Sequence, residues 1–513
     1  MKNKVLRKLL VTVMAAAMCL TAACSSTETA TNNGVGQNGV TTEQEADTKS
    51  AGKSDSTAKT EGDATKTESA GKSDSSAEGQ SFAEAHDAFQ TTLAEKNSDN
   101  DPIPDPPEGY FDLVHYPSKV GDLAAYVSSD PGDGEKHPLI IWVVGGWGNG
   151  IDDFPWCYPA WDDDQTGSAF WRAGVLTMYP SFRGGNGNPG NYETLFGEVD
   201  DIASAYEYAA SLPYVDPDRI YLGGHSTGGT RALLAAEYTD KFRAVFGFGA
   251  VDKIEYHNNS QFTFDTDNEE EYKMRSPVYW LDSVKTPTFL IEGSEGNSSN
   301  LKNIERTSQN DNIHCYIMEG QDHWSVLAPL TGVLAQKILA DTGTECNIAI
   351  TQEELDEAME QEPEIPLPVM QQCIMDELGF RFSYPYLWDM VDVSENGEIS
   401  YTLFSRYEEE NVWDLSLLLF DAYLPEENVD LQLVTDAYKE GGYDVREKTV
   451  GGFPAMEAVG MVEDDEGDVF KTIFVAVQKE DLLFTFQFYI HEGFGDDADP
   501  LFDAIIDSIS FEE

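Results

Sequence analysis

Residues 224–228 read Gly-His-Ser-Thr-Gly, a G-x-S-x-G motif centred on Ser226. Residues 219–223 before it have the apolar pattern of a short strand, and the Ala- and Leu-rich residues 231–238 after it have the pattern of a helix. A serine in such a turn projects its hydroxyl, and a side chain two residues to either side would clash. The motif predicts that Ser226 is the nucleophile of an acyl transfer.

His323 is the predicted general base for this serine. Residues 313–318 have the pattern of a last strand, and Asp322 and His323 follow it closely. A histidine there could take the proton from Ser226 and return it to the leaving group. The other histidines fit less well, because they flank the motif, lie within the strand or precede the sheet; they are His225, His314, His115 and His137.

Two backbone amides are expected to stabilise the oxyanion of the reaction. The amide of Thr227 follows the nucleophile at the start of a helix. The second donor is expected from the turn after residues 139–144, where Trp147 is favoured and Gly146 is the next choice.

The orienting acid is the least determined member of the site. Residues 288–291 have the pattern of a strand, and Glu292 and Glu295 are the nearest carboxylates after it. Glu295 is favoured because it lies beyond the strand, within reach of the loop that carries His323. Asp252, which follows an expected strand at 244–250, and Glu292 remain open as alternatives.

These residues follow strands that alternate with helices between about 105 and 342. Residues 139–144 are continuously apolar, which is typical of a parallel strand buried on both faces. Residues 174–178 predict another such strand, and 198–212 predict a helix with one apolar face. The alternation predicts an α/β domain with a mostly parallel sheet and helices on both faces.

Residues 110–342 resemble the α/β-hydrolase fold and, within it, the catalytic domain of the prolyl oligopeptidase family. The resemblance rests on Phe-Arg-Gly-Gly at 182–185, Val-Asp-Pro-Asp-Arg-Ile at 215–220, the turn around Ser226, and Ser-Pro-Val-Tyr at 276–279 before Thr-Pro at 286–287. It implies a serine hydrolase with Ser226 and His323 in the catalytic roles. We expect no cofactor and no metal, and the sequence has no CxxC pair that would favour a zinc site.

Three departures from the family pattern affect the expected activity. The sequence shows no pattern of the family's N-terminal β-propeller. Thr227 stands where the family usually has an aromatic residue, and Gly296 stands where it usually has the aspartate. The predicted substrate is therefore a small-molecule ester or a peptide, with the scissile bond left open. The alternative is a non-catalytic surface-binding lipoprotein whose hydrolase domain is degenerate.

The net charge excludes one class of partner. The 513 residues contain 93 acidic and 32 basic side chains, a formal charge of −61 at pH 7. Nucleic-acid binding depends on basic groups that neutralise phosphates, so nucleic acid is not an expected partner.

The N-terminus predicts export and attachment to a membrane. Residues 1–23 combine a basic start, an apolar run and small residues, as a signal peptide does. The segment ending at Cys24 resembles the lipobox of bacterial lipoproteins, although Thr21 stands at the usual leucine position. We expect lipid on Cys24 to be the only membrane attachment, on the extracytoplasmic face. Residues 24–104 then form a polar spacer, largely disordered, with one short helix near Phe82 and Phe89.

A second, smaller domain is expected after an acidic, Pro-rich linker at 343–368. Residues 369–513 show alternating strand patterns and a final helix, which predict an α+β fold. The segments around 379–388 and 505–509 resemble the PsbP-like domains of bacterial lipoproteins. No Ser-His-acid set is visible there, since His491 is the only histidine.

Two further features allow more than one interpretation. Cys346 and Cys373 bracket the linker and could form a disulfide, although free thiols are at least as well supported. The aromatic residues Phe154, Trp156 and Tyr158 could line an apolar substrate pocket or simply pack their loop against the core.

Overall fold

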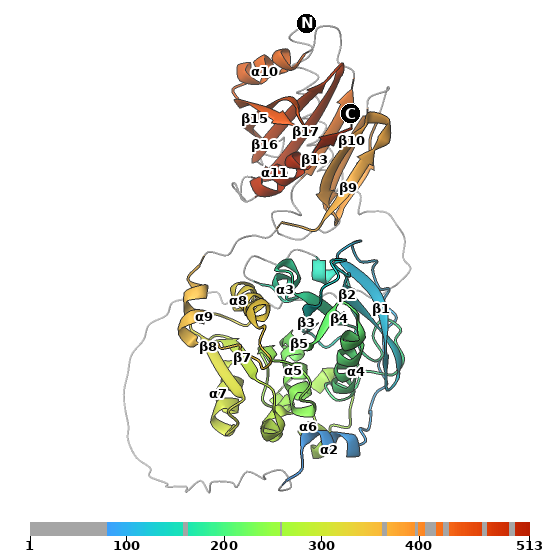
Figure 1. The fold of residues 1–513 in the computed structure, drawn as a ribbon, viewed down its shortest axis with the longest axis vertical. Coiled ribbons are helices and arrows are strands. Elements are labelled where there is room, and N and C mark those ends of the chain that lie inside the picture. Colours follow the sequence, from blue (N-terminus) through green and yellow to red (C-terminus); the bar gives the residue numbers. More distant parts are fainter. Residues whose placement is uncertain are drawn as a thin grey trace, which may run out of the picture. The chain divides into compact units, whose positions relative to one another are not determined.

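A computed structural model describes residues 79–156, 163–256, 259–361, 367–394, 399–405, 417–423, 430–463, 469–491 and 498–512. The signal-peptide and lipid-attachment predictions, including Cys24, and the aromatic Tyr158 lie outside these residues. The described chain forms a hydrolase domain and a C-terminal module, and each is treated by itself (Figure 1).

The hydrolase domain is built on an eight-stranded sheet of order β1-β2-β4-β3-β5-β6-β7-β8. Its strands are β1 Phe111–Ser118, β2 Gly121–Ser128, β3 His137–Val143, β4 Leu176–Pro180, β5 Val215–His225, β6 Val245–Phe248, β7 Thr288–Gly293 and β8 Ile313–Met318. The first two strands pair antiparallel with their neighbours and the other six run parallel. This is the predicted mostly parallel α/β-hydrolase sheet, and its parallel strands bring their carboxyl ends to one edge.

The central strand β3 shows why this sheet is covered on both faces. Leu139, Ile141 and Val143 belong to one hydrophobic cluster, while Ile140 and Trp142 belong to the other. All five side chains are at most 1% exposed. Successive strand residues point to opposite faces, so a continuous apolar run requires a helical layer on each side.

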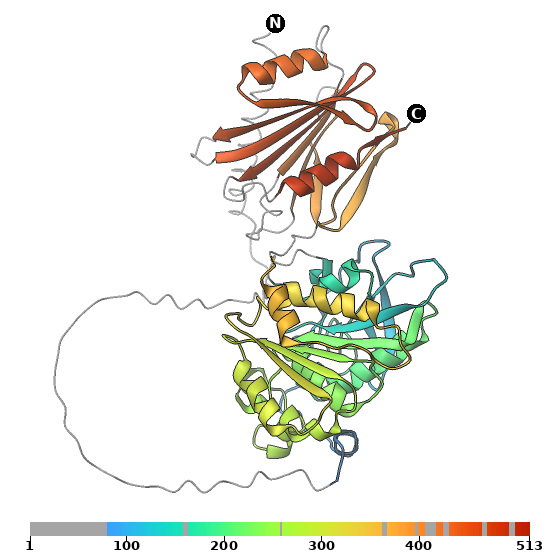
Figure 2. The ribbon, with the colours of Figure 1, turned by 60° about the vertical axis from the view of Figure 1, so that its left-hand side comes forward.

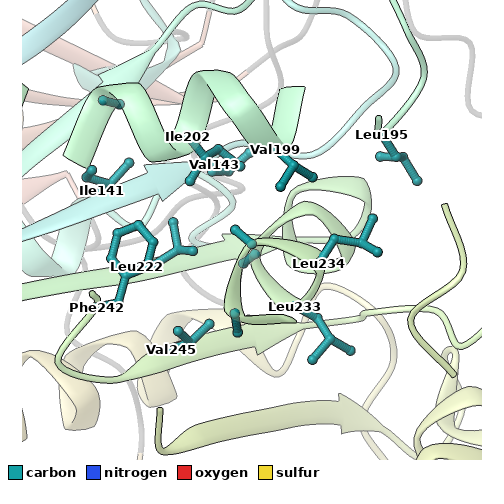
Figure 3. Packing of buried hydrophobic residues seen from close by; sticks show 14 of the residues in the cluster. Ile141, Val143, Leu195, Val199, Ile202, Leu222, Leu233, Leu234, Phe242 and Val245 are labelled. Atoms are coloured by element: carbon teal, nitrogen blue, oxygen red, sulfur yellow. The ribbon is translucent and has the colours of Figure 1, made fainter. Parts of the chain in front are cut away.

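Helices supply both layers (Figures 1 and 2). The helices of the domain are α2 Phe82–Ala88, α3 Ser168–Arg172, α4 Gly197–Ser211, α5 Thr227–Tyr238, α6 Glu269–Lys273, α7 Ser298–Thr307, α8 Leu327–Ala340 and α9 Gln352–Met359. Apolar residues of α2, α4, α5 and α7 join one cluster, and those of α3, α8 and α9 join the other. Figure 3 shows α4 and α5 side by side over the strands, with Val199 and Leu233 among the packed side chains.

The folded domain extends beyond both predicted boundaries. Phe82, assigned to the spacer, is fully buried, and its backbone N–H donates to Ser283 Oγ at 2.9 Å. The predicted linker contains α9, whose N-terminus is capped by the Thr351 side chain. Leu355 and Ala358 on α9 are buried in the same cluster as α8. The acidic composition of α9 is confined to its exposed side, which is why composition alone suggests a linker.

The C-terminal module is an antiparallel α+β unit. Its strands are β9 Met370–Met375, β10 Phe380–Pro385, β11 Trp388–Asp392, β12 Ile399–Ser405, β13 Leu417–Tyr423, β14 Asp444–Val450, β15 Phe453–Glu463, β16 Val469–Lys479, β17 Leu482–His491 and β18 Ser510–Phe511. They form a seven-stranded sheet of order β11-β12-β13-β17-β16-β15-β14 and a three-stranded sheet of order β18-β10-β9. The helices α10 Leu431–Glu440 and α11 Asp499–Asp507 complete the module.

The two helices of the module lie on opposite faces of its large sheet (Figure 2). Tyr438 on α10 stacks on Phe474 of β16, with ring centroids 4.4 Å apart. Phe502 on α11 stacks on Phe488 of β17 at 5.2 Å. Phe488 lies opposite Ile473 in the β16–β17 pair, so these two side chains share one face of the sheet. Phe474 follows Ile473 and points to the other face, so the two helices contact opposite faces.

Cys346 and Cys373, which the sequence allows either to form a disulfide or to stay free, are both free thiols in the structure. Burial raises the pKa values of both thiols above the usual value.

Within the described ranges, no helix combines the length and apolar character needed to cross a bilayer.

Candidate active site

Ser226 occupies a strained turn between β5 and α5, at the carboxyl edge of the parallel strands. Its backbone has φ 57° and ψ −119°, a combination that L-residues rarely adopt and that is found mostly at functional sites. Its N–H donates to the Phe248 carbonyl at 2.8 Å, and its own carbonyl accepts from the Thr230 N–H at 3.0 Å. A Cβ on Gly228 would lie 2.0 Å from the Val143 oxygen, so the turn requires glycine there.

His323 and Glu292 form a hydrogen-bonded pair at the same edge of the sheet. His323 Nδ1 lies 2.9 Å from Glu292 Oε2, and the side chains are 14% and 0% exposed. The other carboxylate oxygen accepts from the Gly293 N–H at 2.8 Å. Gly249 makes room for the pair, because a Cβ there would lie 2.2 Å from His323 Cε1. The carboxylate is therefore placed to hold the imidazole in one tautomer and orientation.

The structure corrects the choice among the three candidate acids. Glu295 is exposed, and its backbone N–H donates to the Gln321 carbonyl at 2.9 Å, so it borders the histidine loop without the ring contact. Asp252 is buried and accepts a hydrogen bond from Asn303 on α7. Glu292 is the last residue before the glycine that ends β7. A side chain within a strand is expected to point into the sheet. Because Glu292 lies at the carboxyl edge, its side chain instead contacts His323 in the loop after β8.

His225 links the serine turn to the histidine loop. Its Nε2 lies 3.0 Å from the His323 carbonyl, and the two rings have centroids 4.5 Å apart. A carbonyl only accepts, so Nε2 carries the proton. Burial, with a smaller contribution from His323, lowers the pKa of His225 to about 3, which keeps the ring neutral at pH 7. His225 thus ties the backbone of His323 to the residue that precedes Ser226.

The predicted oxyanion turn lies directly beside Ser226. A Cβ on Gly145 would lie 3.2 Å from the Ser226 Cβ, which places the turn after β3 in contact with the nucleophile. The Thr227 hydroxyl donates to the Gly146 carbonyl and so fixes the peptide unit that joins Gly146 to Trp147. The structure brings all three proposed oxyanion residues together, and the Thr227 side chain adds its own contact to the turn.

Buried charges hold the far end of this turn. Asn149 Nδ2 donates to Glu198 Oε1 at 2.9 Å, and its Oδ1 accepts from Arg231 Nη2 at 3.0 Å. Arg183, from the Phe-Arg-Gly-Gly segment, makes two hydrogen bonds of 2.9 Å to the Asp201 carboxylate. Ion pairs of this kind fix geometry because each charge is costly to leave unpaired. The network positions the loop that carries the proposed oxyanion donors.

The aromatic residues near the site divide into packing and exposed groups. Trp156 is 1% exposed and packs on Tyr126, with ring centroids 4.9 Å apart, so it belongs to the core and does not line a pocket. Trp147 contacts Phe262 at 5.9 Å. Trp324 is 47% exposed, and its ring lies 5.2 Å from the His323 ring. An exposed indole beside the imidazole is available to contact a substrate.

Sequence reasoning misses the positional roles of His225 and Trp324. The sequence presents His225 only as a rival base, although its place beside Ser226 brings it close to any base that serves that serine. Trp324 follows His323 directly, and adjacency in sequence could have marked it as part of the site. The contact between His225 and the His323 carbonyl cannot be read from spacing, because it depends on how the loop after β8 folds back.

The comparisons with known proteins agree with this geometry. Residues 162–326 match the prolyl oligopeptidase family, a range that contains Ser226, Glu292 and His323. The chain is also 26% identical over 162 residues to an uncharacterized peptidase, YtmA, of Bacillus subtilis. That match covers 29% of this chain and 59% of the relative, so the chain spans about three-fifths of the relative's length. Together they support a prolyl oligopeptidase-like serine hydrolase.

Solved structures with low sequence identity also match. A puromycin-hydrolyzing peptidase of Mycobacterium tuberculosis is 20% identical, with a TM-score of 0.38, over 45% of this chain and 39% of that one. The acylaminoacyl peptidase of Pyrococcus horikoshii is 18% identical, with a TM-score of 0.38, over 48% and 44%. An esterase from Pyrobaculum calidifontis is 15% identical, with a TM-score of 0.34, over 46% and 86%.

Proposed function

We propose that this protein is a serine hydrolase that cleaves an ester or a peptide bond through an acyl-enzyme. The observation that carries the proposal is the hydrogen bond between Glu292, at the end of β7, and His323, on the loop that His225 ties to the Ser226 turn. A buried carboxylate on Nδ1 leaves Nε2 of His323 to act on the serine hydroxyl.

The proposed reaction uses these groups in sequence. Ser226 Oγ attacks the carbonyl carbon of the substrate while His323 accepts its proton. Glu292 stabilises the imidazolium that results. The amides of Thr227 and Trp147 or Gly146 stabilise the oxyanion. His323 then protonates the leaving group, the acyl-enzyme forms, and a water molecule activated by the same histidine hydrolyses it.

The substrate is proposed only by class. The Bacillus subtilis relative bears the name of a peptidase, and the cleavage of esters and of peptides proceeds through the same acyl-enzyme. The exposed indole of Trp324 beside His323 supports a substrate with an apolar or aromatic group next to its scissile carbonyl.

A fluorophosphonate probe tests the proposal directly. We expect the purified protein to be labelled at Ser226, as located by mass spectrometry, and the Ser226→Ala variant to lose both labelling and hydrolysis of small p-nitrophenyl esters. If the variant keeps turnover within a few-fold of the wild type, the nucleophile is wrong. If the wild type is not labelled at all, the non-catalytic binding lipoprotein becomes the better description.

The proposal extends to the place where the enzyme works. Residues 1–23 and Cys24 support export followed by lipid attachment, which would hold the hydrolase domain outside the membrane on its polar spacer. Metabolic labelling with an alkyne fatty acid should mark the wild type and not the Cys24→Ser variant. A wild-type protein that is recovered unlabelled from the soluble fraction would contradict the anchor.

The C-terminal module is proposed to be a PsbP-like accessory unit without catalysis. The support is the resemblance of residues 379–388 and 505–509, together with an antiparallel α+β core. The hydrogen bond between Glu292 and His323 supports a working catalytic set over a degenerate hydrolase domain.

A further inference from the structure

Outside the active site, three ligand-bearing side chains converge where α2 meets α4. They are His86 and Asp87 at the end of α2 and Asp200 in the first turn of α4. One ligand atom from each lies within 4.8 Å of the others. None of the three takes part in the proposed hydrolysis.

His86 has the form of a histidine prepared to bind a metal ion. It is 3% exposed, and its Nε2 lies 3.1 Å from the Phe196 carbonyl, so Nε2 carries the ring proton. Histidine ligands commonly donate their second nitrogen to a backbone carbonyl in this way. The unprotonated Nδ1 is buried and has no hydrogen-bond partner among the described residues, and it faces Asp200 Oδ1 at 3.9 Å.

The charge of the ring agrees with that form. Burial lowers the pKa of His86, and this outweighs the raising effect of Asp200. A neutral imidazole with a free Nδ1 is the species that binds metal, so no proton has to leave the ring first.

Lys119 supplies a cation to the same carboxylates. Its Nζ lies 2.8 Å from Asp200 Oδ1 and 3.5 Å from Asp87 Oδ1. The ammonium is on a flexible, 57% exposed side chain, so it can leave the cluster without disturbing the core. The other charged or polar neighbours are Arg183, whose Nη2 is 3.8 Å from Asp200 Oδ2, and the Tyr238 hydroxyl, which donates to Asp87 at 3.0 Å.

We propose that His86, Asp87 and Asp200 bind a zinc ion in exchange for the Lys119 ammonium. One imidazole nitrogen and two carboxylate oxygens are suitable zinc ligands, and water could complete a tetrahedron. Bonds of about 2.0–2.2 Å place tetrahedral ligand atoms about 3.4 Å apart, so the set must contract slightly. The exposed Asp87 can approach by rotation of its side chain, whereas His86 Nδ1 and Asp200 Oδ1, now 3.9 Å apart, must move about 0.5 Å closer. The ion would fasten α2, which enters the domain after the polar spacer, to α4.

Zinc titration of the full chain against a chelating indicator tests the site. We expect one zinc equivalent bound in the micromolar range, weakened at least tenfold by His86→Gln and strengthened several-fold by Lys119→Met, which removes the competing ammonium. His137→Gln is the matched control, because His137 forms a comparable but exposed pair with Asp133 and should leave the affinity unchanged.

The opposite signs of the two variants distinguish a metal site from a simple ion pair. Zinc should also raise the melting temperature of the wild type and not that of His86→Gln. If His86→Gln fails to fold, Asp87→Asn replaces it, since Asp87 is exposed, and should weaken zinc binding. Absence of micromolar binding by the wild type, or equal affinities in wild type, Asp87→Asn and Lys119→Met, would overturn the proposal.

Discussion

The hydrolase sheet and the module sheet differ in the charged and polar side chains that they bury. The hydrolase sheet buries Glu292 and His225 at the carboxyl edge of its strands, and ionic groups such as Arg183 and Glu198 behind them. The module sheet buries mainly apolar and aromatic side chains, with Phe420, Phe484 and Phe486 at its centre. Among the module's described residues, the one buried acid is Glu457, which is paired with Lys448 on the neighbouring strand.

The difference follows from how the strands are connected. Parallel strands all deliver their carboxyl ends to the same edge, so loops distant in sequence meet there and can assemble a site. Antiparallel strands send successive ends to opposite edges, and the module therefore gathers no comparable set among its described residues. The comparison predicts that activity depends on a few hydrogen bonds at one edge and not on the module.

The strongest test of that view concerns the acid. Glu292→Gln should lower turnover about 10⁴-fold with the fold intact, because the amide no longer fixes the histidine tautomer or stabilises its positive form. Glu295→Gln is the matched control and should stay within a few-fold of the wild type, since its side chain is exposed. Turnover of p-nitrophenyl esters at matched thermal stability measures both. A larger loss in Glu295→Gln would make Glu295 the acid.

Removal of the hydrogen bond from His225 to the His323 carbonyl should cause the next largest loss of turnover. His225→Phe keeps an aromatic ring but leaves that partly buried carbonyl unpaired, which costs about 1–3 kcal/mol, or roughly 5–150-fold in turnover if the loop shifts. His225→Gln can still donate and should retain most of the activity. If both variants have the same kcat, the bond does not position the catalytic loop.

The same residue gives a pH-dependent prediction. The folded pKa of His225, about 3, is lower than the unfolded value of about 6.5, so protonation favours the unfolded state. The wild type should lose stability as the pH falls from about 6.5 towards 3, and His225→Gln should lose less over that range. Urea unfolding at several pH values measures the difference, and parallel curves for the two proteins would contradict the buried neutral ring.

The Thr227 hydroxyl provides a smaller effect on the oxyanion turn. Thr227→Val removes the hydrogen bond to the Gly146 carbonyl and should lower kcat about tenfold, while KM changes little. Thr227→Ser restores the hydroxyl and should recover the rate. An equal loss in both variants would indicate that the methyl group, and not the hydrogen bond, supports the turn.

Removal of the C-terminal module should change the activity least, and it tests whether the hydrolase domain works without the module. A chain that ends after Gln361 keeps α9 and should have the activity of the whole protein. A chain that ends after Thr342 loses the buried Leu355 and should unfold at lower temperature, since a lost buried leucine costs about 2–5 kcal/mol. If the longer of these two chains folds but is inactive, the module contributes to the site and the two regions are not independent.

The sequence alone determined the parts of the site that depend on local pattern. The motif around Ser226 needs only a strand, a turn with glycines and a helix. His323 follows the last strand of the same alternating pattern. Both predictions use short-range information, as does the parallel sheet inferred from apolar runs such as 139–144.

Tertiary structure decided the features that depend on contacts between distant segments. Glu292 and Glu295 are three residues apart, and only the fold of the loop after β8 shows which carboxylate meets the imidazole. The same holds for α9, whose acidic sequence hides a face buried on α8, and for Phe82, which is buried against residues distant in sequence such as Trp280. His86 and Asp200 likewise come together only when the end of α2 lies beside the first turn of α4. A pattern along the chain specifies which elements form, whereas their packing decides which side chains meet.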